Sequence, residues 1–93
     1  MNSSWKCFDT EAIFSGDYSR KFPGDIQKKA RQKLRMIASA VKIDDLKIPP
    51  GNRLHKLTGN RNNQYSISVN DPWRICFNWN DGNASDVEIV DYH

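Results

Sequence analysis

Two histidines, His55 and His93, are the side chains of this sequence best suited to acid–base chemistry. An imidazole group titrates near about pH 6.5, so a pair of them can accept and donate protons near neutrality. Cleavage of RNA by its own 2′-hydroxyl uses two such groups: one removes the 2′-hydroxyl proton and the other protonates the departing 5′-oxygen. His93 is the last residue and directly follows Asp91 and Tyr92, so these three residues form the first candidate site.

The same chemistry needs a cation to stabilise the charge that builds up on phosphorus. Arg74, Lys56 and Arg61 are available for that role. We expect no metal and no cofactor, because the nucleophile belongs to the substrate and no Cys or His spacing resembles a zinc site. The two cysteines, Cys7 and Cys76, lie far apart among aromatic residues, and we expect half-buried thiols rather than a disulfide.

Each of these residues also has a purely structural interpretation. A single histidine on a strand is more often a surface or capping residue than a catalyst. The last three residues could be a frayed end, with Tyr92 covering a sheet edge, and Arg74 could pair with Asp86 or Glu88. On residue types and spacing alone, a ribonuclease is one hypothesis among several.

Charge is distributed unevenly along the chain. Residues 20–61 hold twelve Lys and Arg against three acids, whereas residues 62–93 hold one Arg against five acids. Such a basic block is typical of a face that binds a polyanion, most commonly nucleic acid. The alternative is a solvated helix face without a partner. Among its residues, the best candidates for RNA contact are Lys28, Arg31, Arg35, Lys56 and Arg61.

The first half of the sequence predicts helices. A helix is expected from about Pro23 to about Lys42, because apolar residues recur there at helical spacing and the basic side chains fall on the opposite side. A short helix is expected over residues 9–14 with Asp9 or Thr10 as its N-cap, after a strand over residues 5–8. The expected apolar stripe of the long helix consists of Ile26, Ala30, Leu34, Ile37 and Val41.

From Leu54 onward the apolar residues alternate with a period of two, which predicts an antiparallel meander. Turns are expected at Asp71-Pro72 and at Asp81-Gly82. The apolar stripe of the long helix would cover one face of this sheet, and Arg74 would point to the open face. We therefore expect one α+β domain over residues 1–93, with an N-terminal strand and helices packed on one face of the sheet. No apolar run suits a transmembrane helix or a signal peptide, so a cytoplasmic protein without membrane contact is expected.

Several motifs, in this order along nearly the whole chain, resemble the HigB branch of the RelE-like toxins, the plasmid-maintenance killer family. They are Trp5-Lys6-Cys7-Phe8-Asp9-Thr10-Glu11-Ala12-Ile13-Phe14, Arg53-Leu54-His55-Lys56-Leu57-Thr58-Gly59-Asn60-Arg61, Tyr65-Ser66-Ile67-Ser68-Val69-Asn70, Trp73-Arg74-Ile75-Cys76-Phe77, Asp81-Gly82-Asn83-Ala84-Ser85-Asp86-Val87 and the closing Asp91-Tyr92-His93.

The resemblance implies a RelE-like fold and a ribosome-dependent endoribonuclease that cleaves messenger RNA. It also implies a HigA-type helix-turn-helix antitoxin as partner, with operator DNA bound only through that antitoxin. The family's active-site positions correspond to His55, Asp91, Tyr92 and His93, with Arg74 as a phosphate contact. The basic residues would then suit contacts with ribosomal RNA.

Two other functions compete with this interpretation. A catalytically inactive module of the same fold could bind RNA or an antitoxin without turnover. A DNA-binding repressor fits less well, because the long helix is not followed by a recognition helix. How acid and base roles divide is left open, with His55 and His93 preferred as the proton-transfer pair and Asp91 as the residue that orients a histidine.

Overall fold

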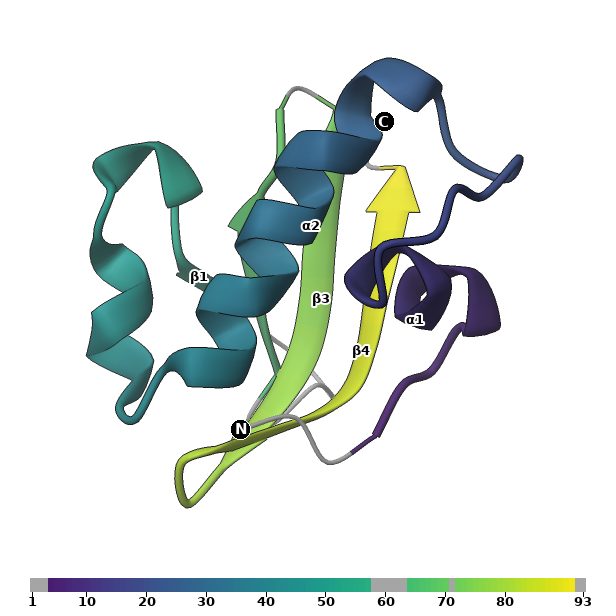
Figure 1. Cartoon of the computed structure of the whole chain (residues 1–93). Helices are drawn as coiled ribbons and strands as arrows, with labels where there is room; N and C mark the ends of the chain where they lie inside the picture. The colour runs from purple at the N-terminus through teal and green to yellow at the C-terminus, as the bar shows by residue number, and fades with distance from the viewer. Residues whose placement is uncertain (1–3, 58–63, 71, 92–93) are drawn as a thin grey trace.

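The computed structural model describes residues 4–57, 64–70 and 72–91, and it shows helices on one face of an antiparallel sheet (Figure 1). The sheet has the order β1-β2-β3-β4, which is also the order along the chain. This α+β architecture confirms the expected fold class. The elements are α1 (Phe8–Phe14), α2 (Gly24–Ser39), the short 3-10 helices η1 (Ile43–Lys47) and η2 (Pro50–Asn52), β1 (His55–Lys56), β2 (Gln64–Ser68), β3 (Trp73–Asn80) and β4 (Asn83–Asp91).

Helix α2 covers the sheet with the predicted stripe, except at its end. Ile26, Ala30, Leu34 and Ile37 are buried, whereas Val41 is 73% exposed. The helix ends at Ser39, and the residue after it has extended backbone, so Val41 leaves the stripe. The prediction for this last position was wrong because the apolar spacing continued past the end of the helix.

The N-terminal segment differs from the prediction in two details. Helix α1 begins at Phe8 with Cys7 as its N-cap, so the expected caps Asp9 and Thr10 lie inside the first turn. The expected strand over residues 5–8 is reduced to one parallel bridge between Trp5 and Val87. A single bridge still fixes this segment beside β4, where the Lys6 amide donates to the Val87 carbonyl at 3.1 Å.

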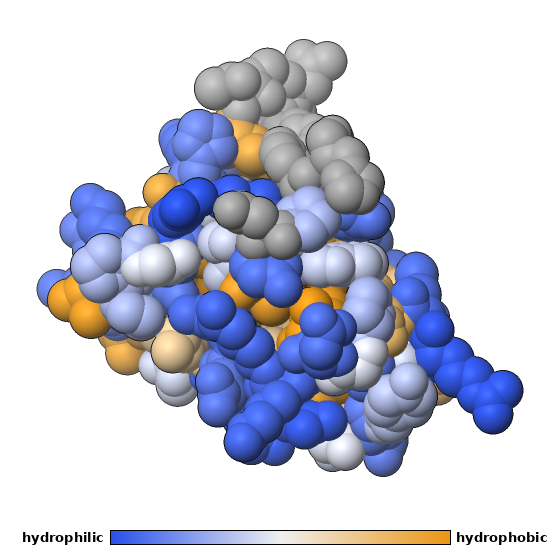
Figure 2. All heavy atoms as spheres, turned by 90° about the horizontal axis from the view of Figure 1, so that it is seen from above, coloured by the Kyte–Doolittle hydropathy of each residue, from blue (hydrophilic) through white to orange (hydrophobic). Residues whose placement is uncertain are grey.

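Register within the sheet follows the predicted alternation. Ile67 pairs with Ile75, which pairs with Ile89, and all three are buried in the core below α2. Both residues of the Asp81-Gly82 turn have positive φ, which matches the twist of a tight hairpin. Seen from above, at the end where α2 starts and β4 ends, hydrophilic side chains dominate the described surface (Figure 2).

Candidate functional site

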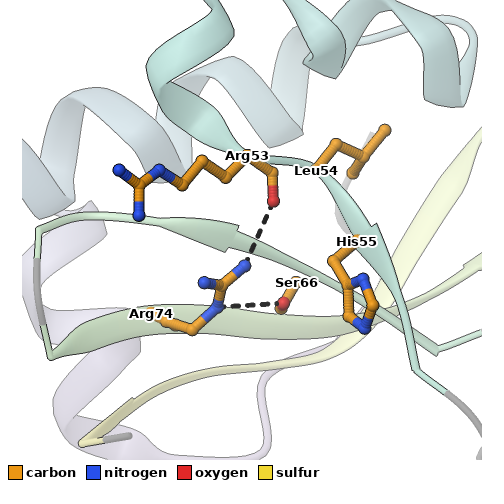
Figure 3. A pocket seen from close by; sticks show the side chains of 5 residues that line it. All are labelled: Arg53, Leu54, His55, Ser66 and Arg74. Atoms are coloured by element: carbon orange, nitrogen blue, oxygen red, sulfur yellow. Dashed lines mark hydrogen bonds between the residues drawn. The ribbon is translucent and has the colours of Figure 1, made fainter.

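His55 and Arg74 line the same open cavity, of about 490 Å³ (Figure 3). Its other lining residues are Arg53, Leu54 and Ser66. The strand register explains why these residues lie together. His55 on β1 pairs with Ser66 on β2, and Arg74 on β3 pairs with Ser68, which is two residues after Ser66 and therefore on the same face of β2. Cross-strand partners share a face, so His55, Ser66 and Arg74 lie on the side of the sheet away from the core. This confirms the expectation that Arg74 points to the open face.

Two hydrogen bonds hold the Arg74 guanidinium group against this face. Its Nε donates to Ser66 Oγ at 3.1 Å, and one Nη donates to the Arg53 carbonyl at 3.1 Å (Figure 3). A planar group fixed at two points presents its charge in a defined direction, which suits recognition of a phosphate.

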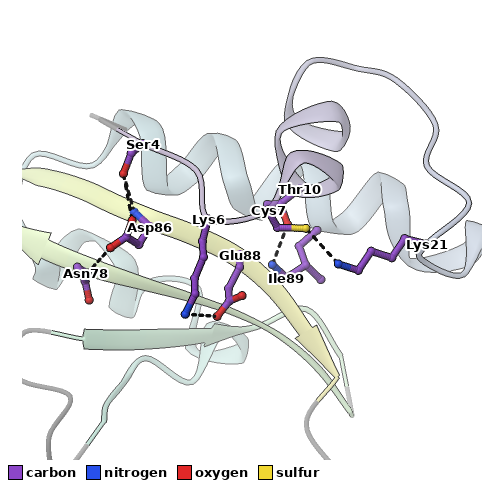
Figure 4. A network of polar contacts seen from close by, with 9 residues as sticks. All are labelled: Ser4, Lys6, Cys7, Thr10, Lys21, Asn78, Asp86, Glu88 and Ile89. Carbon is purple, nitrogen blue, oxygen red and sulfur yellow. Dashed lines mark hydrogen bonds and ion pairs between the residues drawn. The ribbon is translucent and has the colours of Figure 1, made fainter.

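The two carboxylates that the sequence offered as partners of Arg74 bind other groups (Figure 4). Asp86 accepts a hydrogen bond from the Asn78 amide at 3.1 Å, and Glu88 pairs with Lys6 at 3.7 Å. The sequence thus predicted that Arg74 lies on the open face, but not which groups its guanidinium contacts.

Arg53 reaches the cavity because the chain turns sharply after η2. Its φ is +48°, and its amide donates to the Pro50 carbonyl, so its own carbonyl is directed at Arg74. The turn is anchored to α2 by Asn52, which is fully buried. The Asn52 side chain accepts a hydrogen bond from Lys33 and donates to the Leu46 carbonyl at 3.1 Å.

Lys33 is a buried cation, with 7% of its surface exposed. Burial lowers the pKa of its ammonium group, and the nearby charge of Lys29 lowers it further. The contact with Asn52 therefore gives a desolvated charge an acceptor, and it joins α2 to the loop that forms one wall of the cavity.

The remaining predicted catalytic residues are not brought to this cavity within the described part of the chain. Asp91 is exposed at the end of β4 and pairs with Trp73, whereas Arg74 pairs with Val90. By strand alternation Asp91 thus falls on the opposite face from Arg74. Tyr92 and His93 lie outside the described residues.

The predicted RNA-binding residues are also dispersed. Lys28 and Arg35 are exposed on α2, and the Arg31 Nε donates to the Ile13 carbonyl at 2.8 Å, which ties α2 to α1. The Lys56 ammonium lies 5.9 Å from the centre of the Tyr65 ring. Arg61 lies outside the described residues.

Sequence reasoning missed Arg53 and Ser66 as site residues. Arg53 stands two positions before His55 in one of the family motifs, but the motif does not show that its backbone turns toward Arg74. No pattern in the sequence distinguishes Ser66 from other serines on the outer face of a strand. Only the strand register places its hydroxyl next to the Arg74 guanidinium.

Neither cysteine forms a disulfide, as expected. Burial raises the pKa of the Cys7 thiol, but hydrogen bonds from Thr10, Lys21 and the Asp9 backbone together outweigh burial and hold this pKa below its usual value (Figure 4). Cys76 is buried in β3.

Within residues 4–57, 64–70 and 72–91, no three His, Cys, Asp or Glu side chains converge as a metal-binding group. In the same residues no helix has both the length and the apolar character needed to cross a membrane.

Comparison with known proteins gives a consistent family. Residues 9–93 match the family described as RelE-like toxin of type II toxin-antitoxin system HigB. The chain is 42% identical over 65 residues to Toxin HigB-1 of Vibrio cholerae, an alignment that covers 70% of this chain and 68% of that protein. It is 30% identical to Endoribonuclease HigB of Proteus vulgaris over 97 aligned positions that cover both chains completely. A protein of Haemophilus influenzae is 33% identical over 74 residues, covering 80% of this chain and 73% of that protein. The chain therefore belongs to the HigB-like toxins, a RelE-like family of type II toxin–antitoxin systems.

Proposed function

We propose that this protein is the toxin of a type II toxin–antitoxin pair and acts as an endoribonuclease that cleaves translated messenger RNA and so inhibits growth. The observation that carries the proposal is the open cavity in which His55 and Arg74 face the same space, in a chain of a toxin family. The relative from Proteus vulgaris, which aligns over its full length, bears the name Endoribonuclease HigB.

The proposed reaction is attack of the 2′-hydroxyl oxygen on the adjacent phosphorus. The new P–O2′ bond forms as the P–O5′ bond breaks, which leaves a 2′,3′-cyclic phosphate and a free 5′-hydroxyl. His55 exchanges a proton with one of these oxygens, and Arg74 stabilises the negative charge on the phosphoryl oxygens. The reaction needs no metal ion as Lewis acid, because the guanidinium group supplies the positive charge.

We propose from the family resemblance that the C-terminal residues complete the site, although Asp91 falls on the opposite face of the sheet from Arg74. We assign His93 as the second proton-transfer group, Asp91 as the residue that orients a histidine, and Tyr92 as a group that stacks on a base or donates to a phosphate. The family resemblance supports these roles, and chemistry supports the pairing, since one imidazole must be protonated while the other is neutral.

The proposed partners are a HigA-type helix-turn-helix antitoxin, the ribosome and the messenger RNA, in the cytoplasm. Operator DNA would be bound only through the antitoxin. Lys28, Arg35, Lys56 and Arg61 are proposed to contact ribosomal RNA. Arg31 is assigned to the same surface, although its guanidinium group already donates to backbone carbonyls near α1.

Expression without the antitoxin tests the function. The chain should arrest growth, and primer extension on a translated message should show new 5′ ends. His55→Ala should remove both effects, whereas Lys42→Gln, at an exposed residue beyond the end of α2, should remove neither. Growth arrest without new 5′ ends would instead identify an inactive module that only binds RNA or its partner.

Ribosome and metal dependence need separate experiments. Purified protein should cleave a message poorly until ribosomes are added. Because ribosomes themselves require magnesium, metal catalysis is tested by placing sulfur at a non-bridging oxygen of the cleaved phosphate. A metal-independent enzyme gains no rescue from thiophilic Mn²⁺ or Cd²⁺, and clear rescue would contradict the proposed mechanism.

A further inference from the structure

A second cavity, of about 220 Å³, adjoins the one that contains His55. Arg53 lines both cavities, so they share a wall. In Figure 3 the Arg53 side chain extends from the His55 region toward α2 and the turn between β2 and β3. The lining residues of the second cavity are Lys29, Gly51, Arg53, Ser68, Val69 and Asn70.

The chemistry of this lining suits an anion. Lys29 comes from α2 and Arg53 from the loop after η2, so two cations converge from different elements, and none of the lining residues is acidic. The Asn70 side-chain oxygen accepts a hydrogen bond from the Trp73 amide at 3.3 Å. The amide nitrogen of Asn70 is therefore the atom of that side chain that can donate to a ligand.

The walls of this cavity are fixed before any ligand arrives. Gly51 and Arg53 flank Asn52, whose fully buried side chain binds Lys33 of α2 and the Leu46 carbonyl. On the opposite side, the Ser68 hydroxyl donates to the Asn70 carbonyl at 3.4 Å. A preorganised wall lowers the entropic cost of binding, because the loop does not have to become ordered around the ligand.

We propose that this second cavity binds the phosphodiester group of a nucleotide that flanks the cleaved nucleotide, with Lys29 and Arg53 as its positive contacts and Asn70 as a donor. The inference rests on the proposed function for the identity of the ligand. An RNA strand bound in the first cavity by His55 and Arg74 continues along the protein surface on either side of the bound nucleotide. The second cavity adjoins the first at Arg53 and is lined by cations, so it is the site that the next phosphate would meet. The substrate RNA itself is therefore the occupant.

Binding of short single-stranded RNA, carrying 2′-deoxy sugars so that it cannot be cleaved, tests the site independently of catalysis. Lys29→Gln removes one charge from an exposed side chain, and Lys42→Gln makes the same change beyond the end of α2. We expect Lys29→Gln to weaken binding about two- to fivefold, as for an exposed charge pair. It should also reduce the slope of log K against log salt by about 0.7, the value for one phosphate of a single strand. Lys42→Gln should change neither quantity.

A methylphosphonate linkage placed at successive positions of the RNA then locates the contact. A methylphosphonate at the linkage that contacts Lys29 should weaken binding to the wild-type protein but not to Lys29→Gln. The effects of the neutral linkage and of the substitution are therefore not additive at that position. A mononucleotide that fills only the first cavity should bind both proteins equally. Equal losses for a mononucleotide and a longer RNA would show a free phosphate site and overturn the inference.

These experiments distinguish a failure of the second-cavity inference from a failure of the endoribonuclease proposal. If the protein cleaves translated RNA in a His55-dependent way while Lys29→Gln and Lys42→Gln bind RNA alike, the inference fails and the proposed function stands. If Lys29 couples to one linkage but no cleavage occurs, the second cavity binds RNA and the endoribonuclease proposal fails. A wild-type protein that binds no short RNA would also overturn the inference.

Discussion

Asn52→Ala is the substitution for which the structure gives the clearest energetic expectation. The Asn52 side chain is fully buried, accepts a hydrogen bond from the buried ammonium of Lys33 and donates to the Leu46 carbonyl. Losing a hydrogen bond from a charged donor costs about 1.5–3 kcal/mol, and leaving a buried carbonyl without its donor costs about 1–3 kcal/mol. Because water entering the space offsets part of this, we expect a loss of about 2–5 kcal/mol in the free energy of unfolding.

This loss is large for the size of the chain. A domain of 93 residues has a total stability of about 5–14 kcal/mol at the usual 0.05–0.15 kcal/mol per residue. Urea unfolding followed by the fluorescence of the three tryptophans measures the change. Asn52→Asp keeps an acceptor for Lys33 and loses only the amide donor to the Leu46 carbonyl and the Met36 sulfur, so it should cost less than Asn52→Ala.

A double-mutant cycle with Lys33→Met isolates the contact itself. The two substitutions should be non-additive by about 1.5 kcal/mol or more, because each removes the same charged hydrogen bond. A loss below about 1 kcal/mol for Asn52→Ala with an unchanged urea slope, or additive effects in the cycle, would refute the account of this network.

The remaining predictions concern the site and the stability of the chain. Arg74→Ala should lower single-turnover cleavage about 10²–10³-fold, and Arg74→Lys should not restore it fully, because an ammonium group cannot replace a planar guanidinium group. Cys7 should react with iodoacetamide at neutral pH faster than the buried Cys76, as peptide mass mapping can show. The lowered pKa of Lys33 means that the unfolded chain binds its proton more tightly, so the free energy of unfolding should rise with pH from that lowered value toward the ordinary one; Lys33→Met should remove this rise in urea titrations at several pH values. Gly82→Ala should lower stability by about 1–2 kcal/mol in the same assay, because Gly82 has a φ of +81° and an added Cβ would lie 3.2 Å from a backbone oxygen.

Local patterns predicted the main elements well because their causes are local. The spacing of Ile26, Ala30, Leu34 and Ile37 fixes one face of α2, and Asp81-Gly82 supplies the positive φ values of a hairpin turn. The C-terminal end of α2 at Ser39 could not be predicted as well, because apolar spacing alone does not show where the backbone leaves the helix.

The site was predicted only in part, because it depends on contacts between distant segments. His55 and Arg74 were chosen from their side-chain chemistry, and the sheet register brings both to one cavity. The role of Arg53 depends on a left-handed backbone conformation that arginine seldom adopts, and that of Lys29 on the return of the η2 loop beside α2. Neither is encoded in a short pattern around the residue itself.

The brevity of β1 has a consequence for motion. This strand spans two residues at the edge of the sheet, and its pairing with β2 involves His55 and Lys56. Elements with few contacts open at lower free energy than core strands such as β3, so amide hydrogens of β1 should exchange with solvent well before those of β3. His55 thus lies on the edge strand β1, which opens at low free energy, whereas Arg74 lies on the inner strand β3. Any RNA or protein that spans both would slow exchange at β1, and that protection would report occupancy of the cavity without a catalytic assay.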